Sequence, residues 1–137
     1  MKRNLVALLV AGLGSAFSAH ADGPFGETVG VNGTDVWALS CPIGTASARA
    51  RVNDGILAGN VISVQVINPH GSATTRSAVD GGAGSPDAIL ASRAGLYLVN
   101  VSSSTVLGLE GYTITLDCRD AFGADIAGDQ SELIQDQ

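Results

Sequence analysis

After residue 21 the chain contains no lysine, a single histidine and two cysteines. Five arginines then stand against thirteen Asp and Glu residues, a net charge of 5 − 13 = −8, whereas all 137 residues carry −6 because Lys2 and Arg3 lie in the first segment. No basic cluster is present that would bind nucleic acid or an anionic membrane surface. We therefore expect a soluble acidic protein with neither nucleic acid nor membrane among its partners.

The scarcity of histidine limits the catalysis that the chain could support. A serine or cysteine nucleophile needs a base beside it, and His70 stands in the sequence NPHG, where a surface turn is expected. No G-x-S-x-G elbow, P-loop or dinucleotide fingerprint is present. We therefore predict that the chain is not an enzyme and requires no organic cofactor.

Several carboxylates occur in segments with turn composition. Aspartate in a turn commonly accepts local backbone hydrogen bonds, and a glycosidase would need two carboxylates placed around a sugar. Turn carboxylates are also oxygen ligands of the kind that Ca²⁺ prefers, although the EF-hand spacing is absent. Asp80 and Asp87 are the calcium candidates on this basis, and the other turn carboxylates are Asp54 and Glu110.

The two cysteines, Cys41 and Cys118, indicate one disulfide in an exported chain. Closing so long a loop would stabilise the fold by about 4 kcal/mol. Each cysteine ends an inward-facing run, and bridged Cα atoms must come within about 7 Å. The first and last core strands therefore run parallel side by side, or face each other across two sheets, or one cysteine lies just outside its strand.

Residues 1–21 have the pattern of a secretory signal peptide. Lys2 and Arg3 form a positive start, residues 5–13 form an apolar run too short to span a bilayer, and Ala-His-Ala at 19–21 fits the cleavage rule. The pattern predicts a secreted or periplasmic mature chain that begins at Asp22.

Short runs with a period of two, separated by Gly, Asn, Asp and Pro, follow residue 34. No amphipathic helix of useful length is present. This pattern predicts an all-β domain over residues 35–119, an antiparallel β-sandwich of jelly-roll-like form. The expected strands are 35–41, 46–53, 60–68 and the polar run 72–79, with 88–94 as either a strand or a helical turn.

The most regular stretch is 95–118, in which two alternating runs flank a polar connection that contains glycine. Such a pattern is typical of two adjacent antiparallel strands, so we predict a hairpin here. Tyr97 and Tyr112 fall on the inward faces of these runs, as Trp37 does in its own run. We interpret the three aromatic residues as core side chains rather than as a platform for stacking sugars.

The two ends of the mature chain differ from the centre. Residues 22–34 are rich in glycine with a short apolar alternation, which predicts an extended lead-in or an edge strand. Residues 120–137 are acidic with few large apolar side chains, which predicts a flexible tail, with a short helix beginning near Ser131 as the one exception.

Four runs of this chain resemble the bacterial pre-peptidase C-terminal domain family: DVW at 35–37, ISVQVI with NPHG at 62–71, GLYLVNV at 95–101 and GYTITL at 111–116. The resemblance covers residues 34–119. It implies a jelly-roll-like β-sandwich that accompanies exported peptidases and contributes no catalytic residues. This chain has no catalytic domain beside that region, so the resemblance implies a stand-alone exported module.

From these observations we expect a non-catalytic accessory or binding module that engages another extracytoplasmic protein or a glycan. The alternative is a structural subunit of an extracellular fibre or surface assembly. In that case residues 22–34 would self-associate by adding as a strand to the edge of a neighbouring sheet.

Overall fold

The computed structural model describes residues 24–54, 61–76, 84–104 and 108–137. The predicted signal peptide lies outside this part of the chain, as does Asp80. The described residues include no helix that is long and apolar enough to cross a membrane.

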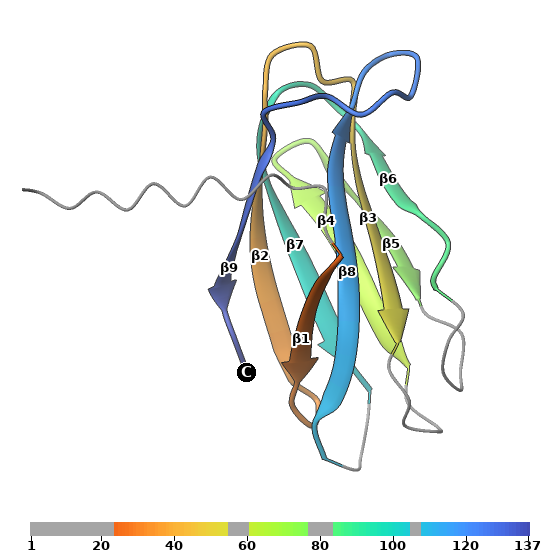
Figure 1. The fold of residues 1–137 in the computed structure, drawn as a ribbon, viewed down its shortest axis with the longest axis vertical. Helices are drawn as coiled ribbons and strands as arrows, with labels where there is room; N and C mark the ends of the chain where they lie inside the picture. Colours follow the sequence, from red (N-terminus) through yellow and green to blue (C-terminus); the bar gives the residue numbers. More distant parts are fainter. Residues whose placement is uncertain (1–23, 55–60, 77–83, 105–107) are drawn as a thin grey trace, which may run out of the picture.

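Within these described residues, nine strands form two antiparallel sheets that pack face to face (Figure 1). The four-stranded sheet has the order β1 (Phe25–Val29), β8 (Glu110–Arg119), β3 (Ser47–Asp54) and β6 (Ala88–Ala91). The five-stranded sheet has the order β5 (Gly71–Arg76), β4 (Ile62–Asn68), β7 (Gly95–Ser103), β2 (Thr34–Cys41) and β9 (Gln130–Gln135). The predicted all-β antiparallel sandwich with one disulfide is therefore confirmed.

The core is built from the alternating inward faces of both sheets. Trp37, Tyr97 and Tyr112 are 4%, 1% and 2% exposed, which confirms their interpretation as core side chains. Phe25 of β1 packs against Trp37 with 5.4 Å between ring centroids, and covers the core on that side. The aliphatic part of the core includes Leu39, Val52, Ile62, Val64, Val66, Val99, Val101, Ile114 and Leu116.

The predicted hairpin at 95–118 is wrong. Both runs form strands, but β7 lies between β4 and β2 in one sheet and β8 lies between β1 and β3 in the other. Alternation determines which face of a strand is buried and does not determine its neighbour. β7 pairs instead with all eight residues of β2, from Thr34 opposite Ser102 to Cys41 opposite Gly95.

The disulfide joins the two sheets. Cys41 ends β2 and Cys118 lies near the end of β8, with 5.6 Å between their Cα atoms. Because β2 and β8 belong to different sheets, the two strands face each other across the sandwich. Of the three arrangements left open by the sequence, this one is correct.

Each sheet ends in an edge strand on either side. Residues 25–29 form an edge strand, β1, which pairs with β8, as predicted for the N-terminal segment. β5 is likewise a polar edge strand, and the run at 88–94 contains a strand, β6, rather than a helical turn.

The prediction of a flexible acidic tail is wrong for the C-terminal segment, and so is the short helix. Gln130–Gln135 form β9, which pairs with the otherwise open edge of β2, and Asp129 is only 2% exposed. Leu133 packs against the core. The segment therefore forms a strand although its acidic composition favours disorder, because its backbone pairs with a free sheet edge and Leu133 contacts the core.

Candidate binding surfaces

The carboxylates considered in the sequence do not share one environment. Asp54 ends β3 and Glu110 begins β8, so their assignment to turns is wrong, and both side chains are buried. Their strands place them in register with the inward-facing residues. Asp87 precedes β6 and forms an ion pair with Arg49 at 3.4 Å. Within residues 24–54, 61–76, 84–104 and 108–137, no three His, Cys, Asp or Glu residues form a group that could hold a metal ion.

Asp80 lies outside the described residues, so the structure brings no pair of calcium candidates together, and the calcium hypothesis stays a prediction. His70 lies in the turn between β4 and β5, where its amide donates to the Asn68 side-chain oxygen at 2.8 Å. Its place in an exposed turn is as the sequence indicates.

The outer face of the four-stranded sheet carries an ordered ion-pair network. The Arg49 guanidinium donates to Asp117 through both Nε and Nη2, and Arg119 Nε approaches Asp117 at 3.3 Å. Hydrogen bonding to Asp117 raises the pKa of Arg49, with the charges of Asp117 and Asp87 adding to this effect against the cost of partial burial. These groups therefore satisfy one another and have little capacity left for a ligand.

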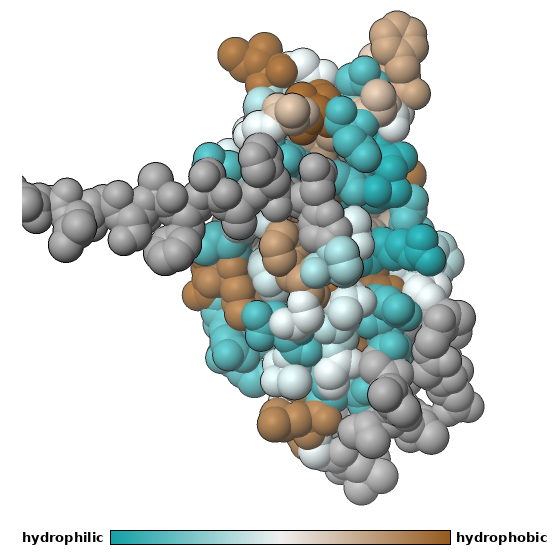
Figure 2. Space-filling model, in the orientation of Figure 1, coloured by the Kyte–Doolittle hydropathy of each residue, from teal (hydrophilic) through white to brown (hydrophobic). Residues whose placement is uncertain are grey.

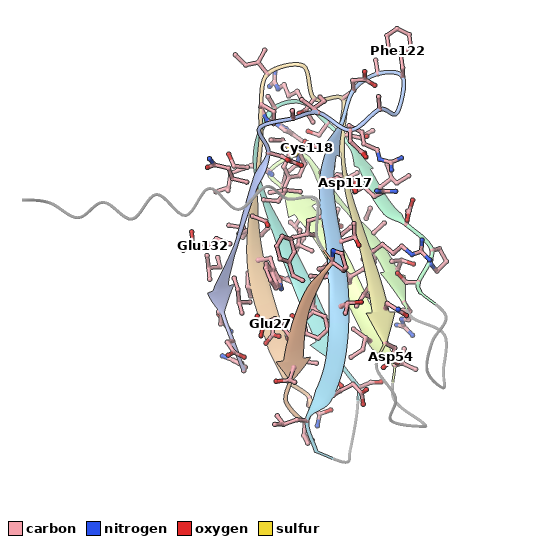
Figure 3. All side chains as sticks on the ribbon, viewed as in Figure 1. Glu27, Asp54, Asp117, Cys118, Phe122 and Glu132 are labelled. Atoms are coloured by element: carbon pink, nitrogen blue, oxygen red, sulfur yellow. A yellow bond between two sulfur atoms is a disulfide. The ribbon has the colours of Figure 1, made fainter. Side chains whose placement is uncertain are left out.

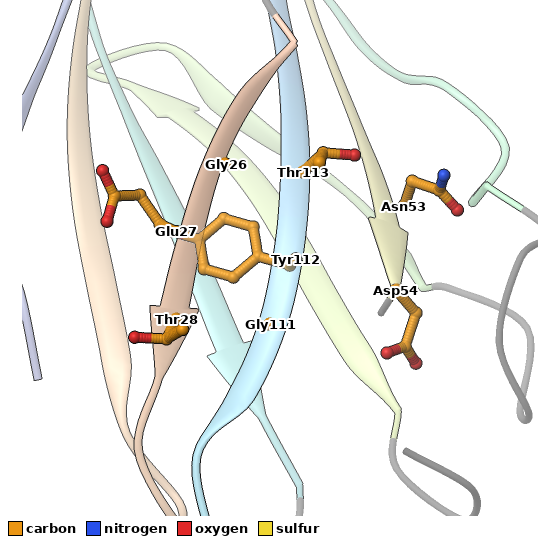
Figure 4. A pocket seen from close by; sticks show the side chains of 8 residues that line it. All are labelled: Gly26, Glu27, Thr28, Asn53, Asp54, Gly111, Tyr112 and Thr113. Carbon is orange, nitrogen blue, oxygen red and sulfur yellow. The ribbon is translucent and has the colours of Figure 1, made fainter. Parts of the chain in front are cut away.

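The same face is hollowed beside this network, across β1, β8 and β3 (Figure 4). We call this region the outer groove. A hollow of about 540 Å³ and an adjoining one of about 230 Å³ share Asn53 and Thr113 and so form one groove. Its lining residues are Pro24, Gly26, Glu27, Thr28, Arg51, Asn53, Asp54, Gly111, Tyr112, Thr113 and Thr115.

A buried polar network lies behind the groove. Asp35 is fully buried, and its Oδ2 accepts a hydrogen bond from the Tyr112 hydroxyl at 2.8 Å. The Tyr112 oxygen accepts from Trp37 Nε1 at 3.1 Å, and Asp35 Oδ1 accepts from the Gln137 amide at 3.0 Å. Burial raises the pKa of Tyr112, and Asp35 adds to this rise, while the hydrogen bond from Trp37 opposes it. The network is closed to solvent and links the two sheets, so its role is structural.

At the disulfide end of the sandwich, two turns each present an almost fully exposed apolar side chain. Ile43 in the β2–β3 turn is 95% exposed and Phe122 in the β8–β9 loop is 96% exposed. Figure 3 shows Phe122 projecting from the tip of its loop, above Cys118. Figure 2 shows hydrophobic residues projecting at both ends of the sandwich, whereas the surface over β8 and β3 is hydrophilic to neutral. We call Ile43 and Phe122 the apolar tips.

Hydrogen bonds hold both apolar tips in place. Asp120 Oδ1 accepts from the amides of Phe122 and Ala124 at 2.8 and 2.9 Å, and Gly123, with φ +82°, completes the turn. In the other turn Gly44 has φ +102°, and Thr45 Oγ1 donates to the Pro42 carbonyl at 2.8 Å.

The two turns are also joined to each other. The Ala46 amide donates to the Arg119 carbonyl at 2.7 Å, and the Cys41–Cys118 bridge lies directly beneath. The apolar tips are therefore carried by one rigid surface.

Sequence reasoning missed the apolar tips. The sequence predicts a flexible tail around Phe122, and Ile43 stands between two turn-forming residues that predict no role for it. The available signal was a large apolar residue directly before a glycine in a turn, as in Ile43-Gly44 and Phe122-Gly123.

Comparisons with known proteins give no match: no protein-family model, curated protein or solved structure resembles this chain closely enough to be assigned. The resemblance to the pre-peptidase C-terminal domain family therefore stays a prediction.

Proposed function

We propose that this chain is an exported, non-catalytic binding module that docks onto another extracytoplasmic protein through the end of the sandwich at its disulfide. The observation that carries the proposal is the pair of apolar tips, Ile43 and Phe122, which stand 95% and 96% exposed on one rigid surface. The signal-peptide pattern supports export, and the disulfide is compatible with an oxidising compartment.

Exposed apolar side chains on an ordered turn suggest a docking role because they gain most from burial. Burying a Phe or Ile side chain stabilises a complex by about 2 kcal/mol each before the costs of association. Since the turns are already held by Asp120, Thr45 and the disulfide, little conformational entropy is lost on binding. Large apolar side chains fixed at the centre of a surface are typical anchors of protein interfaces.

A protein partner fits this surface better than a lipid surface or a glycan. The mature chain has a net charge of 5 − 13 = −8, and Asp120 and Asp125 lie beside Phe122, so anionic lipid would be repelled. A glycan would require several hydrogen-bonding side chains around the tips, and Asp120 Oδ1 is already occupied by two backbone amides.

A photo-crosslinking amino acid placed at position 43 or 122 in the exported protein tests the proposal. We expect both positions to give the same protein adduct, identified by mass spectrometry. The matched control is position 109, because Leu109 is also exposed, at 65%, but precedes β8 and so lies at the opposite end of the sandwich. Phe122→Ser should abolish the adduct formed from position 43.

Other outcomes would contradict the proposal. Adducts with lipid alone would indicate membrane insertion, and adducts with a second copy of this chain would favour an assembly. Equal labelling from positions 109 and 122 would show that docking does not depend on the apolar tips.

The alternative function, a structural subunit that adds residues 22–34 to a neighbouring sheet, stays a prediction. In the structure Phe25–Val29 pair with β8 of their own chain, and Val29 is fully buried. Truncation of this segment would damage the fold as well as any assembly, so light scattering of the intact chain over rising concentration is the better test. A constant monomer mass would exclude the alternative.

A further inference from the structure

We propose that the outer groove is a second binding site, independent of the apolar tips, and that its ligand is a saccharide carrying a carboxylate group. Outward-facing threonine, asparagine and arginine side chains of β8 and β3 line the groove together with β1, and the carboxylate residues Glu27 and Asp54 also belong to the lining. Figure 4 shows the larger part of the groove. The larger hollow alone, of about 540 Å³, falls within the range of roughly 300–1,000 Å³ that is typical of small-molecule sites.

The backbone of the groove floor is already paired, which argues against a peptide ligand. β8 is bonded to β1 on one side and to β3 on the other, so its amides and carbonyls are taken. An added strand therefore has no backbone partner at the floor of the groove. Recognition must come from side chains.

The available side chains suit hydroxyl groups. Thr113 and Thr115 of β8 stand directly opposite Asn53 and Arg51 of β3 in the ladder. Figure 4 shows the Thr113 hydroxyl pointing towards β3, on which Asn53 lies. Threonine and asparagine side chains both donate and accept hydrogen bonds, as do the vicinal hydroxyls of a sugar ring.

Two glycines leave room for a sugar ring above the sheet. Gly26 and Gly111 face the groove next to Thr113 and Thr28, their respective partners across β1 and β8. A Cβ built at either glycine meets no atom within 4 Å, so the space above the backbone is open. A ring can therefore approach the strands closely between the threonine side chains.

Arg51 gives the groove its expected preference for an anion. Its neighbours Arg49 and Arg119 are both paired with carboxylates, whereas no ion pair involves Arg51 among the described residues. Acidic residues outnumber basic ones by 13 to 7 in the sequence. A shortage of carboxylates therefore does not explain why Arg51 has no ion pair among the described residues. An exposed guanidinium beside hydroxyl-binding groups matches a ligand carboxylate in geometry and charge.

The position of Arg51 depends on Gly84. A Cβ built at Gly84 would lie 2.7 Å from Arg51 Nη2 and 2.8 Å from Nε, so the guanidinium occupies the space of the missing side chain. Two carboxylate residues also line the hollow. Asp54 is only 4% exposed, and Figure 4 shows Glu27 pointing towards β2, away from Asn53 and Thr113. The ligand carboxylate is therefore expected at the Arg51 end of the groove.

Titration of the oxidised mature protein with tri-galacturonic acid and with its methyl ester, followed by amide chemical shifts, tests the proposal. The two probes differ in charge and share their hydroxyl pattern. We expect shifts at Gly26, Asn53, Gly111 and Thr113 with both probes, and binding of the acid that is about tenfold tighter, since a hydrogen bond to a charged group contributes about 1.5 kcal/mol.

Three variants separate the effect of the Arg51 side chain on binding from the effect of the protein's overall charge. Arg51→Gln should reduce binding of the acid to the level of the ester and leave the ester unchanged. Gly84→Ala retains the charge but displaces the guanidinium, so it should weaken binding of the acid in the same direction. Arg76→Gln is the matched control, because Arg76 lies on β5 of the other sheet and carries the same charge.

The proposal is overturned if neither probe binds, if the shifts fall outside the groove, or if Arg51→Gln behaves like Arg76→Gln. Equal binding of acid and ester would overturn the assignment of the anion site. Phe122→Ser should leave saccharide binding unchanged, because Phe122 lies beyond the end of β8 and outside the groove.

Discussion

Single side chains in this protein have sharply different roles although they share one strand face. Arg49 and Arg51 are two residues apart on the outward face of β3, yet Arg49 is bound to Asp117 and Asp87 while Arg51 forms no ion pair within the described residues. The Asp117 side chain is only 3% exposed, so hydrogen bonds from Arg49 and Arg119 take the place of hydrating water around this carboxylate.

We therefore expect Arg49→Gln to lower the free energy of unfolding by about 2–3 kcal/mol, because it leaves the Asp117 carboxylate buried with Arg119 alone. Arg51→Gln should change it by less than about 0.5 kcal/mol, since it removes an exposed cation without an ion-pair partner. Urea unfolding of both variants measures the difference. Equal effects would show that the pairing with Asp117 contributes little to stability.

Tyr112 is a second residue whose environment has a measurable consequence. Its hydroxyl lies between Trp37 and the buried Asp35 carboxylate, and burial is the main cause of its raised pKa. The folded state therefore retains this proton at a pH where the unfolded chain, with a tyrosine pKa of about 10, loses it.

The free energy of unfolding should consequently fall as the pH rises above about 10, by about 1.4 kcal/mol per pH unit from this residue, and should not depend on it below that pH. Urea unfolding from about pH 9 to about pH 11 measures the slope. Tyr112→Phe should remove this component of the slope, although it also lowers stability at neutral pH because Trp37 Nε1 loses its acceptor. An unchanged slope in the variant would contradict the assignment.

Among the strands, β9 is the one that orders the C-terminal segment. It covers the edge of β2, and the segment after it is anchored by a bond from the Gly30 amide to the Gln137 carbonyl at 2.7 Å. This close approach is possible only because Gly33 has no side chain: a Cβ there would lie 2.6 Å from the same carbonyl oxygen.

Gly33→Ala should therefore displace residue 137 and lower the free energy of unfolding by about 1–2 kcal/mol through loss of its two hydrogen bonds. Amide exchange at Gly30 should become faster because its acceptor moves away. Gly26→Ala is the matched control, since a Cβ at Gly26 meets no atom within 4 Å and should leave Gly30 exchange unchanged. Normal protection of Gly30 in Gly33→Ala would contradict the anchoring role.

For the whole molecule, the disulfide has two effects that can be separated. It connects the sheets across a sequence separation of 77 residues, and it underlies the two turns that present Ile43 and Phe122. The outer groove lies on the face of one sheet, so the two proposed sites use different surfaces of one sandwich.

Replacing both cysteines by alanine should lower the free energy of unfolding by about 4 kcal/mol, as the chain-entropy model gives for a loop of this length. The two turns should also become more mobile, which amide relaxation at residues 43 and 122 would detect. Saccharide binding in the outer groove should persist as long as the variant remains folded. A loss of less than about 1 kcal/mol would mean that the bridge closes a loop that is already restricted when unfolded.

Local periodicity was sufficient for part of this structure. The alternation in β2, β4, β7 and β8 identified the all-β class and the inward aromatic residues, because the side-chain period of a strand is a local property. The pairing of Cys41 with Cys118 followed from there being two cysteines. Three features were decided only by the tertiary structure: the placement of β7 and β8 in different sheets, the strand in the C-terminal segment, and the burial of Asp54 and Glu110.

The apolar tips and the outer groove belong to this second group. A strand's neighbours depend on which edges remain free once distant segments have packed, and exposure depends on what lies above a residue in space. Phe122 is apolar in sequence and exposed in structure, while Glu110 is charged in sequence and buried in structure. Alternation along each core strand specifies which of its faces turns inward, because that period is local. Which loops, grooves and side chains remain accessible for binding depends on how the two sheets pack.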